Sequence, residues 1–281
     1  MQGPQITWLA DGRRLHLHHG PIDMIVEASG PGTQAAYECA AARFETLLDE
    51  LVVDLPRLRQ PDGPDPMNTV GQKMANAIRP FQNHFVTPMA AVAGAGADAI
   101  LQALCNGPGL QKAYVNNGGD VALRLTADEV MRAAVATNPP GQITIGHLDG
   151  VGGIATSGWR GRSHSFGIAD SVTILAQNTA KADVAATMIG NFVDLPNHPA
   201  ITRCPADQLS PDSDLGDRLV TTDVAKLNAD DINLALDRGA NFAQDCLSRN
   251  LINGAVIVLA GQYRVVGYLP LIQKEPEIAH A

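Results

Sequence analysis

The chain has 281 residues, of which 45% are hydrophobic and 17% charged, and its net charge is −9 at pH 7. This length and apolar content suit one large domain, or two fused halves that share a core. The acidic balance and the 4% aromatic content argue against a nucleic-acid binder, which would carry basic patches and stacking aromatics. An anionic ligand would therefore need a local concentration of positive charge.

Nothing in the sequence indicates export or a membrane. The first residues lack a basic-then-apolar signal pattern, and no apolar run reaches the roughly 18 residues that a spanning helix needs. The four cysteines lie far apart and form no C-x-x-C pair, which favours free thiols in a reducing compartment over zinc or disulfides. We therefore expect a cytoplasmic protein without a membrane partner.

Strands are predicted at the start of the chain. Residues 7–9 and 15–17 flank Asp11-Gly12, a favourable hairpin turn, and residues 22–28 are a third candidate. A helix should follow, because apolar residues recur every three or four positions from Tyr37 to Leu51, and Pro56 should end it. The prolines and glycines of residues 54–71 predict a loop or lid.

Strand pairs and helices alternate through the rest of the chain. The patterns predict helices over 69–78, 95–105, 179–192 and 229–251, and strands over 113–115, 121–125, 143–147, 171–176, 255–259 and 264–268. Residues 194–217, rich in Pro and Asp, should form a surface loop. Paired strands of this kind favour an α+β fold, with antiparallel sheet and helices packed on one face.

The most unusual stretch runs from Gly152 to His164, in a glycine-rich setting. Glycines let backbone N–H groups approach an anion, and Thr156 and Ser157 can donate hydrogen bonds to it. Arg160, Arg162 and His164 form a basic cluster that could hold a phosphate or carboxylate. The alternative is a glycine-rich turn whose arginines are solvated.

Two other stretches have both a chemical and a structural interpretation. Asp183 and Thr187 share a helix face, which suits an oxygen-liganded cation such as Mg²⁺, or else Asp183 merely favours the helix dipole. Residues 116–120, Asn-Asn-Gly-Gly-Asp, form a hairpin turn or a loop that lets a ligand lie against bare backbone. Residues 92–98 lack the third glycine of a dinucleotide fingerprint, and close helix packing explains them better.

Taken in order, these stretches resemble the ApbE-type flavin transferase superfamily, over residues 89–192. Ala97-Asp98 matches its Ala-Asp at a helix start, residues 116–120 its N-x-G-G-D-like turn, and residues 155–158 its A-T-S-G loop. Residues 182–187 match its A-D-x-x-A-T helix. The chain is similar to a divergent branch whose members are mostly uncharacterised. The resemblance implies one T-fold-related domain over 1–281 that binds FAD or FMN with Mg²⁺.

The family's best-known activity transfers FMN from FAD to a protein threonine, with Mg²⁺ on the pyrophosphate stabilising the departing AMP. The metal ligands implied here are Asp183, Thr187 and backbone oxygens near Ala186 and Val92. The implied catalytic residues are Asp183, His164 and Asp120, with Asp98 a further candidate for the general base. The implied cofactor contacts are Asn117, Gly118, Gly119, Ala155, Thr156, Ser157, Gly158, Arg160 and Arg162.

The sequence also departs from the family. The usual A-K-G before the helix reads Val92-Ala93-Gly94, and no D-P-x-T-G segment follows His164. Three functions therefore compete: a Mg²⁺-dependent flavin or nucleotide transferase, an enzyme of pterin-type one-carbon cofactor biosynthesis with a bicyclic anionic substrate, and a non-catalytic flavin-binding protein. Each takes a small nucleotide-like or pterin-like ligand, and a homo-oligomer is compatible with all three.

Overall fold

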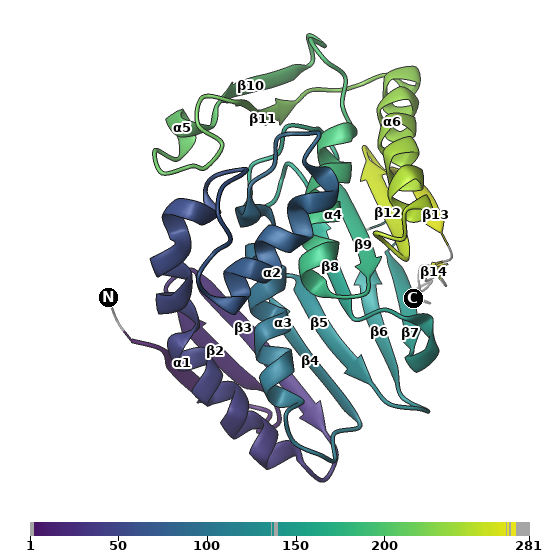
Figure 1. Ribbon diagram of the computed structural model, residues 1–281. Helices are drawn as coiled ribbons and strands as arrows, with labels where there is room; N and C mark the ends of the chain where they lie inside the picture. The colour runs from purple at the N-terminus through teal and green to yellow at the C-terminus, as the bar shows by residue number, and fades with distance from the viewer. Residues whose placement is uncertain (1–2, 136, 138–139, 268, 270, 274–281) are drawn as a thin grey trace.

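Nine antiparallel strands form the central sheet, in the order β1-β2-β3-β4-β5-β8-β9-β12-β13 (Figure 1). This computed structural model describes residues 3–135, 137, 140–267, 269 and 271–273. The strands are β1 (Gln5–Trp8), β2 (Leu15–His19), β3 (Ile22–Ser29), β4 (Lys112–Asn117), β5 (Asp120–Leu125), β8 (Gly153–Ser157), β9 (Ser171–Ala176), β12 (Gly254–Leu259) and β13 (Gln262–Gly267). Seven of these strands join in four sequential hairpins, β1-β2, β2-β3, β4-β5 and β12-β13.

Helices cover one face of this sheet. They are α1 (Thr33–Leu58), α2 (Thr69–Ile78), α3 (Val92–Leu104), α4 (Thr179–Phe192) and α6 (Ala229–Ser248), and Figure 1 shows the first four lying across the strands. Strand residues alternate in burial, so Leu15 and Leu17, for example, join the same core as Phe44 of α1. The α+β prediction, with antiparallel sheet and helices on one face, is confirmed.

A second, three-stranded sheet packs on the opposite face. It contains β6 (Val130–Val135), β7 (Gly141–Gly146) and β14 (Leu271–Gln273), in the order β14-β7-β6. Ile143 and Ile145 of β7 are buried against Leu123, Leu175 and Val256 of the large sheet. Because β5, β9 and β12 are thus covered on both faces, they carry apolar residues at successive positions rather than in strict alternation.

Several element boundaries differ from the sequence-based ones. Helix α1 continues through Pro56 to Leu58, because Leu58 is fully buried in the core and the proline lies in the last turn. Helix α3 begins at Val92, three residues early, since Gly94 allows its first turn to pack on the start of α4. Tyr268, the last residue of one predicted strand, lies outside the described residues.

The two predicted loop regions are partly structured. In 54–71, residues 59–68 join α1 to α2, and the buried Asp54 carboxylate accepts hydrogen bonds from the Met67 and Asn68 backbone N–H groups at 3.0 and 2.8 Å. The connection is therefore tied to α1. In 194–217, Ile201–Pro205 forms β10, which pairs with β11 (Leu219–Val224), and Ala206–Leu209 forms the short helix α5.

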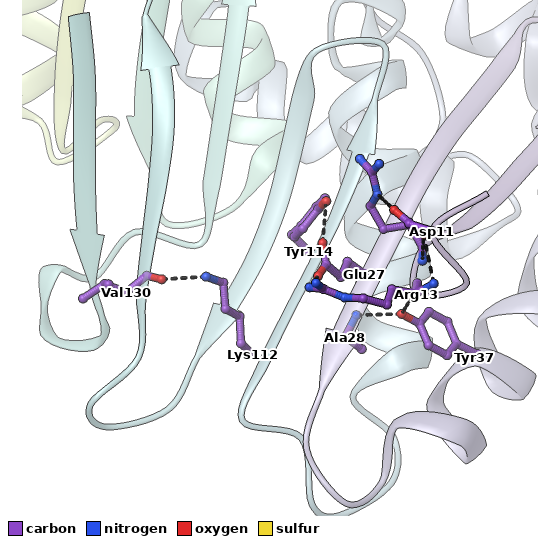
Figure 2. A network of polar contacts seen from close by, with 9 residues as sticks. Asp11, Arg13, Glu27, Ala28, Tyr37, Lys112, Tyr114 and Val130 are labelled. Carbon is purple, nitrogen blue, oxygen red and sulfur yellow. Dashed lines mark hydrogen bonds and ion pairs between the residues drawn. The ribbon is translucent and has the colours of Figure 1, made fainter. Parts of the chain in front are cut away.

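Polar contacts tie the first strands to α1 (Figure 2). The Tyr37 hydroxyl donates to the Arg13 carbonyl at 2.6 Å and accepts from the Ala28 N–H at 3.0 Å. Glu27 accepts from Arg13 and from the Tyr114 hydroxyl, the latter at 2.9 Å. These bonds fix the β1-β2 turn against β3 and β4. The edge of the sheet formed by β1 and β2 is therefore held by side-chain contacts as well as by the backbone hydrogen bonds between strands.

Among the residues that the structure describes, no helix combines the length and apolar character that a membrane crossing requires.

Candidate functional site

A cavity with a volume of about 780 Å³ lies on the helix-covered side of the sheet. Its walls come from the ends of β4, β5 and β8, from α4, from the 3-10 helix η2 (Pro88–Ala91), and from residues 158–166 and 210–215. We call it the first cavity. Its size is typical of a site for a small organic ligand.

Two carboxyl groups form the floor of the first cavity. Asp120, the first residue of β5, is 7% exposed, and Asp183 follows the first turn of α4. The Thr156 N–H donates to Asp120 at 3.3 Å, the Gly94 N–H donates to Asp183 at 2.9 Å, and the two carboxyl groups hydrogen-bond to each other. Such a pair attracts a proton or a cation.

Burial and proximity shift the ionisation of this pair. Burial raises the pKa of Asp120 to about 6, against the opposing effect of the Thr156 N–H. Burial also raises the pKa of Asp183 well above its usual range, and the neighbouring charge of Asp120 raises it further. Two buried carboxyl groups that lie next to each other do not both ionise readily unless a cation neutralises their charges.

A reciprocal clamp between α3 and α4 holds the floor in place. Asp183 of α4 accepts from Gly94 in the first turn of α3, while Asp98 of α3 accepts from the Thr179 and Ala180 N–H groups of α4, both at 3.0 Å. A Cβ at Gly94 would lie 2.4 Å from the Thr179 carbonyl oxygen, so the contact requires glycine. Asp98 thus caps α4 and does not line the first cavity, unlike the other two candidates for the general base, Asp120 and His164.

The glycine-rich stretch divides into a strand and a loop. A Cβ at Gly153, in β8, would lie 2.3 Å from the Thr179 nitrogen, and one at Gly158 would lie 2.4 Å from the Asp170 carbonyl oxygen. These glycines therefore permit close backbone packing, which explains them without an anion. Thr156, Ser157 and Gly158 do line the first cavity, whereas Ala155 is fully buried in the core.

The three basic residues of this stretch all line the first cavity, but their surroundings differ. The Arg160 Nε atom donates to Asp170 at 3.0 Å, and its guanidinium lies 4.4 Å from the Trp159 ring centroid. Arg162 lies against the β4-β5 turn, where a Cβ at Gly118 would be 2.1 Å from its Nη2 atom. Arg162 forms no ion pair within the described residues, although its charge opposes the rise in the pKa of Asp120, whereas Arg160 is paired with Asp170.

The β4-β5 turn serves the hairpin and also borders the first cavity. Gly118 and Gly119 have φ values of +65° and +116°, which favour glycine, and Asn116 accepts from the Gly119 N–H at 2.9 Å. Asn117 donates to the Ala93 carbonyl at 2.9 Å. Asn117 and Gly118 line the first cavity and Gly119 does not.

The predicted metal-binding residues are brought together only in part. Asp183, Thr187 and Val92 line the first cavity, whereas Ala186 is fully buried beneath them. Within the described residues, no group of three or more His, Cys, Asp and Glu side chains is placed to hold a metal ion. The oxygen donors of Asp183, Asp120 and Thr187 nonetheless fit Mg²⁺, which keeps several waters and takes few protein ligands.

Sequence reasoning missed one wall of the first cavity. Residues 206–218, here called the flap, join β10 to β11 and contribute Ser210, Asp212, Ser213, Asp214 and Leu215. The Thr87 hydroxyl donates to the Asp214 carboxylate, and the Arg218 guanidinium lies 3.4 Å from the Phe85 ring centroid. Nothing in the sequence of this segment indicated these two contacts.

The lining of the first cavity carries more negative than positive charge. It has five aspartates against three arginines, with His164 in addition; the charged residues are Asp120, Asp170, Asp183, Asp212, Asp214, Arg59, Arg160 and Arg162. The acids of the floor lie beside the α4 face that carries Thr187. An anionic ligand would therefore meet repulsion unless a cation accompanied it.

This arrangement of sheets and helices is that of the flavinyl transferase ApbE. The apo crystal structure of ApbE from Pseudomonas stutzeri matches with a TM-score of 0.51, covers 95% of both chains and is 14% identical, so it establishes the fold. Residues 6–265 match the family model described as "AbpE bacteria", and the chain belongs to that family. It represents a divergent branch of the ApbE-like proteins.

Curated relatives match part of the chain. A UPF0280 protein from Methanococcus vannielii is 38% identical over 138 residues, which are 47% of this chain and 54% of the relative. A UPF0280 protein from Methanopyrus kandleri is 41% identical over 125 residues, or 44% of this chain and 48% of the relative. The chain thus spans about half the length of these curated relatives.

Proposed function

We propose that the first cavity binds a flavin nucleotide together with a divalent cation, and that the protein is a flavin-nucleotide transferase. The observation that carries this proposal is the buried pair Asp120–Asp183, which lies beside Thr187 on the floor of a 780 Å³ cavity. Its fold is shared with a flavinyl transferase. Burial keeps this pair of carboxyl groups from ionising. A bound cation would stabilise both carboxylates, so that both could be charged.

The residues of the chain would have separate tasks in such a reaction. Asp183 and Thr187 would hold Mg²⁺, whose charge would stabilise a pyrophosphate and its leaving group when bound. Arg162, which lines the same cavity and forms no ion pair with a carboxylate of the described residues, would contact phosphate oxygens. His164 and Asp120 line the same cavity, and they would be the groups that move a proton.

One departure from the family favours a second candidate, an enzyme acting on a pterin-like bicyclic anion. The position of the family lysine is Ala93, whose carbonyl accepts a hydrogen bond from Asn117. A transferase site would lack that ammonium group at this point. A smaller anion would still find Arg162 at the rim and the aspartates of the floor and flap as acceptors for ring N–H groups.

Isothermal titration with FAD, with and without Mg²⁺, followed by analysis for AMP, tests the proposal. We expect binding that requires Mg²⁺, with AMP release that Asp183→Asn abolishes and that the control Asp207→Asn retains. Asp207 is exposed on α5 and does not line the first cavity. Binding without AMP release would indicate a flavin-binding protein or a missing acceptor. Absence of binding would refute the flavin proposal, and a reduced pterin would be titrated next.

A further inference from the structure

A second cavity of about 490 Å³ opens between α2, α3, β5 and the start of α4. It shares no lining residue with the first cavity. Its wall includes the apolar side chains of Ala77, Leu101 and Ala180, which surround the opening left where the three helices diverge above the sheet. An organic molecule could bury carbon surface there.

Three cationic side chains line this second cavity, in a chain whose net charge is −9. Lys73 comes from α2, Arg124 from β5 and Lys181 from the first turn of α4. Arg124 reaches the cavity because β5 alternates: its neighbours Leu123 and Leu125 face the three-stranded sheet, so Arg124 faces the helices. Three elements that are separate in the sequence, α2, β5 and α4, therefore each contribute a positively charged side chain to the second cavity.

None of these three side chains forms an ion pair within the described part of the chain. The Lys73 ammonium donates to the Gln102 side-chain oxygen at 2.7 Å and the Lys181 ammonium to that of Gln177 at 2.9 Å, both uncharged amides. No described residue forms a hydrogen bond or ion pair with the Arg124 guanidinium.

The one acid of the lining offsets only part of this positive charge: the charge of nearby Lys73 counteracts the rise that burial causes in the pKa of Asp98. Asp98 is the only carboxylate among the described residues that line the cavity. Both of its oxygens accept backbone N–H groups of α4.

We propose that the second cavity is a binding site for a small organic anion with an apolar body, such as an aromatic carboxylate, sulfonate or phosphate ester. The apolar wall would contact the body of the ligand, and Lys73, Arg124 and Lys181 would contact its anionic group. Because the two cavities have no residue in common, this proposal can be tested separately from the proposed flavin site.

The test uses 8-anilinonaphthalene-1-sulfonate as a fluorescent probe of the full-length chain. We expect saturable binding that the double variant Arg124→Gln/Lys181→Gln weakens about fivefold to tenfold, since it removes two of the three cations that line the second cavity. The charge-conserving variant Arg124→Lys/Lys181→Arg should bind within about twofold of the wild type, because the cations remain. The uncharged analogue N-phenyl-1-naphthylamine should bind more weakly than the sulfonate.

Two single variants serve as controls. Arg132→Gln removes an exposed cation from β6, on the far side of the sheet, and should leave binding unchanged. Arg162→Gln reports on the first cavity and should also leave it unchanged. Loss of binding in Arg162→Gln alone would place the probe in the first cavity and overturn the proposal. The absence of saturable binding, or equal affinity for the uncharged analogue, would overturn it too.

Discussion

The carboxyl pair on the floor of the first cavity should make the stability of the metal-free protein fall as the pH rises. Asp120 and Asp183 both have raised pKa values in the folded protein, so the folded chain binds more protons than the unfolded chain between pH 4 and 7. Their contribution is therefore most favourable below the unfolded pKa near 3.8 and is lost as the pH passes through about 6.

The size of this effect follows from Asp120 alone. The difference between a pKa of about 6 and the ordinary value of 3.8 corresponds to about 3 kcal/mol of stability lost between pH 4 and pH 8. In Asp183→Asn the second charge is gone, while the amide oxygen can still accept from the Gly94 N–H. The variant should therefore be more stable than the wild type at pH 8, because it lacks the buried Asp183 charge, while the loss that burial of Asp120 causes remains.

Urea unfolding in the presence of EDTA at pH 5, 6.5 and 8 measures this difference. The wild type should lose stability across the series, and Asp183→Asn should lose less, since only the contribution of Asp120 remains. The control Asp207→Asn, which removes an exposed charge, should follow the wild-type profile. Parallel profiles for the wild type and Asp183→Asn would refute the reasoning, because they would mean that Asp183 does not have a raised pKa in the folded protein.

Three further predictions concern the rest of the chain. Replacing Asp98 by Ala removes the acceptor of two N–H groups of α4 and should cost about 1–2 kcal/mol of stability in urea unfolding; a cost below about 0.3 kcal/mol would argue against the clamp. Cys246 is fully buried, and burial raises its pKa to about 11, so a thiol reagent should modify the exposed Cys39 at once and Cys246 only after unfolding. Thr87→Val removes the hydroxyl that holds Asp214, and hydrogen exchange in the flap should accelerate, whereas unchanged exchange would show that other contacts hold it.

Local signals explain what could be predicted of the fold. The bounds of α2 and α4 agree with the prediction because Asn68 and Asn178 each cap a helix that starts one residue later. Strand β8 was not predicted from the sequence, because glycine has a low strand propensity. Gly153 of this strand is explained instead by close packing against the start of α4. Strand β6 was also not predicted. Its exposed side chains alternate with side chains that are mostly only partly buried, so the sequence carries no clear apolar alternation, and the strand forms by pairing with β7.

The candidate site shows the same division between local and distant information. Asp183 and Thr187 could be paired from the sequence because helix geometry alone places them on one face. The contact between Thr87 and Asp214 joins residues 127 positions apart, and no spacing rule predicts such a pair. The role of Asp98 as a cap of α4 likewise depends on packing between two helices that are separated in the chain by six strands.

The clamp between α3 and α4 also affects the cost of binding a ligand. Each helix satisfies N–H groups in the first turn of the other, so both helix starts are held in position by bonds internal to the protein. A ligand that reaches Asp183 then meets a carboxyl group whose orientation is already set, and little conformational entropy remains to be lost on binding. Affinity in this cavity should accordingly depend on charge balance more than on ordering of the chain.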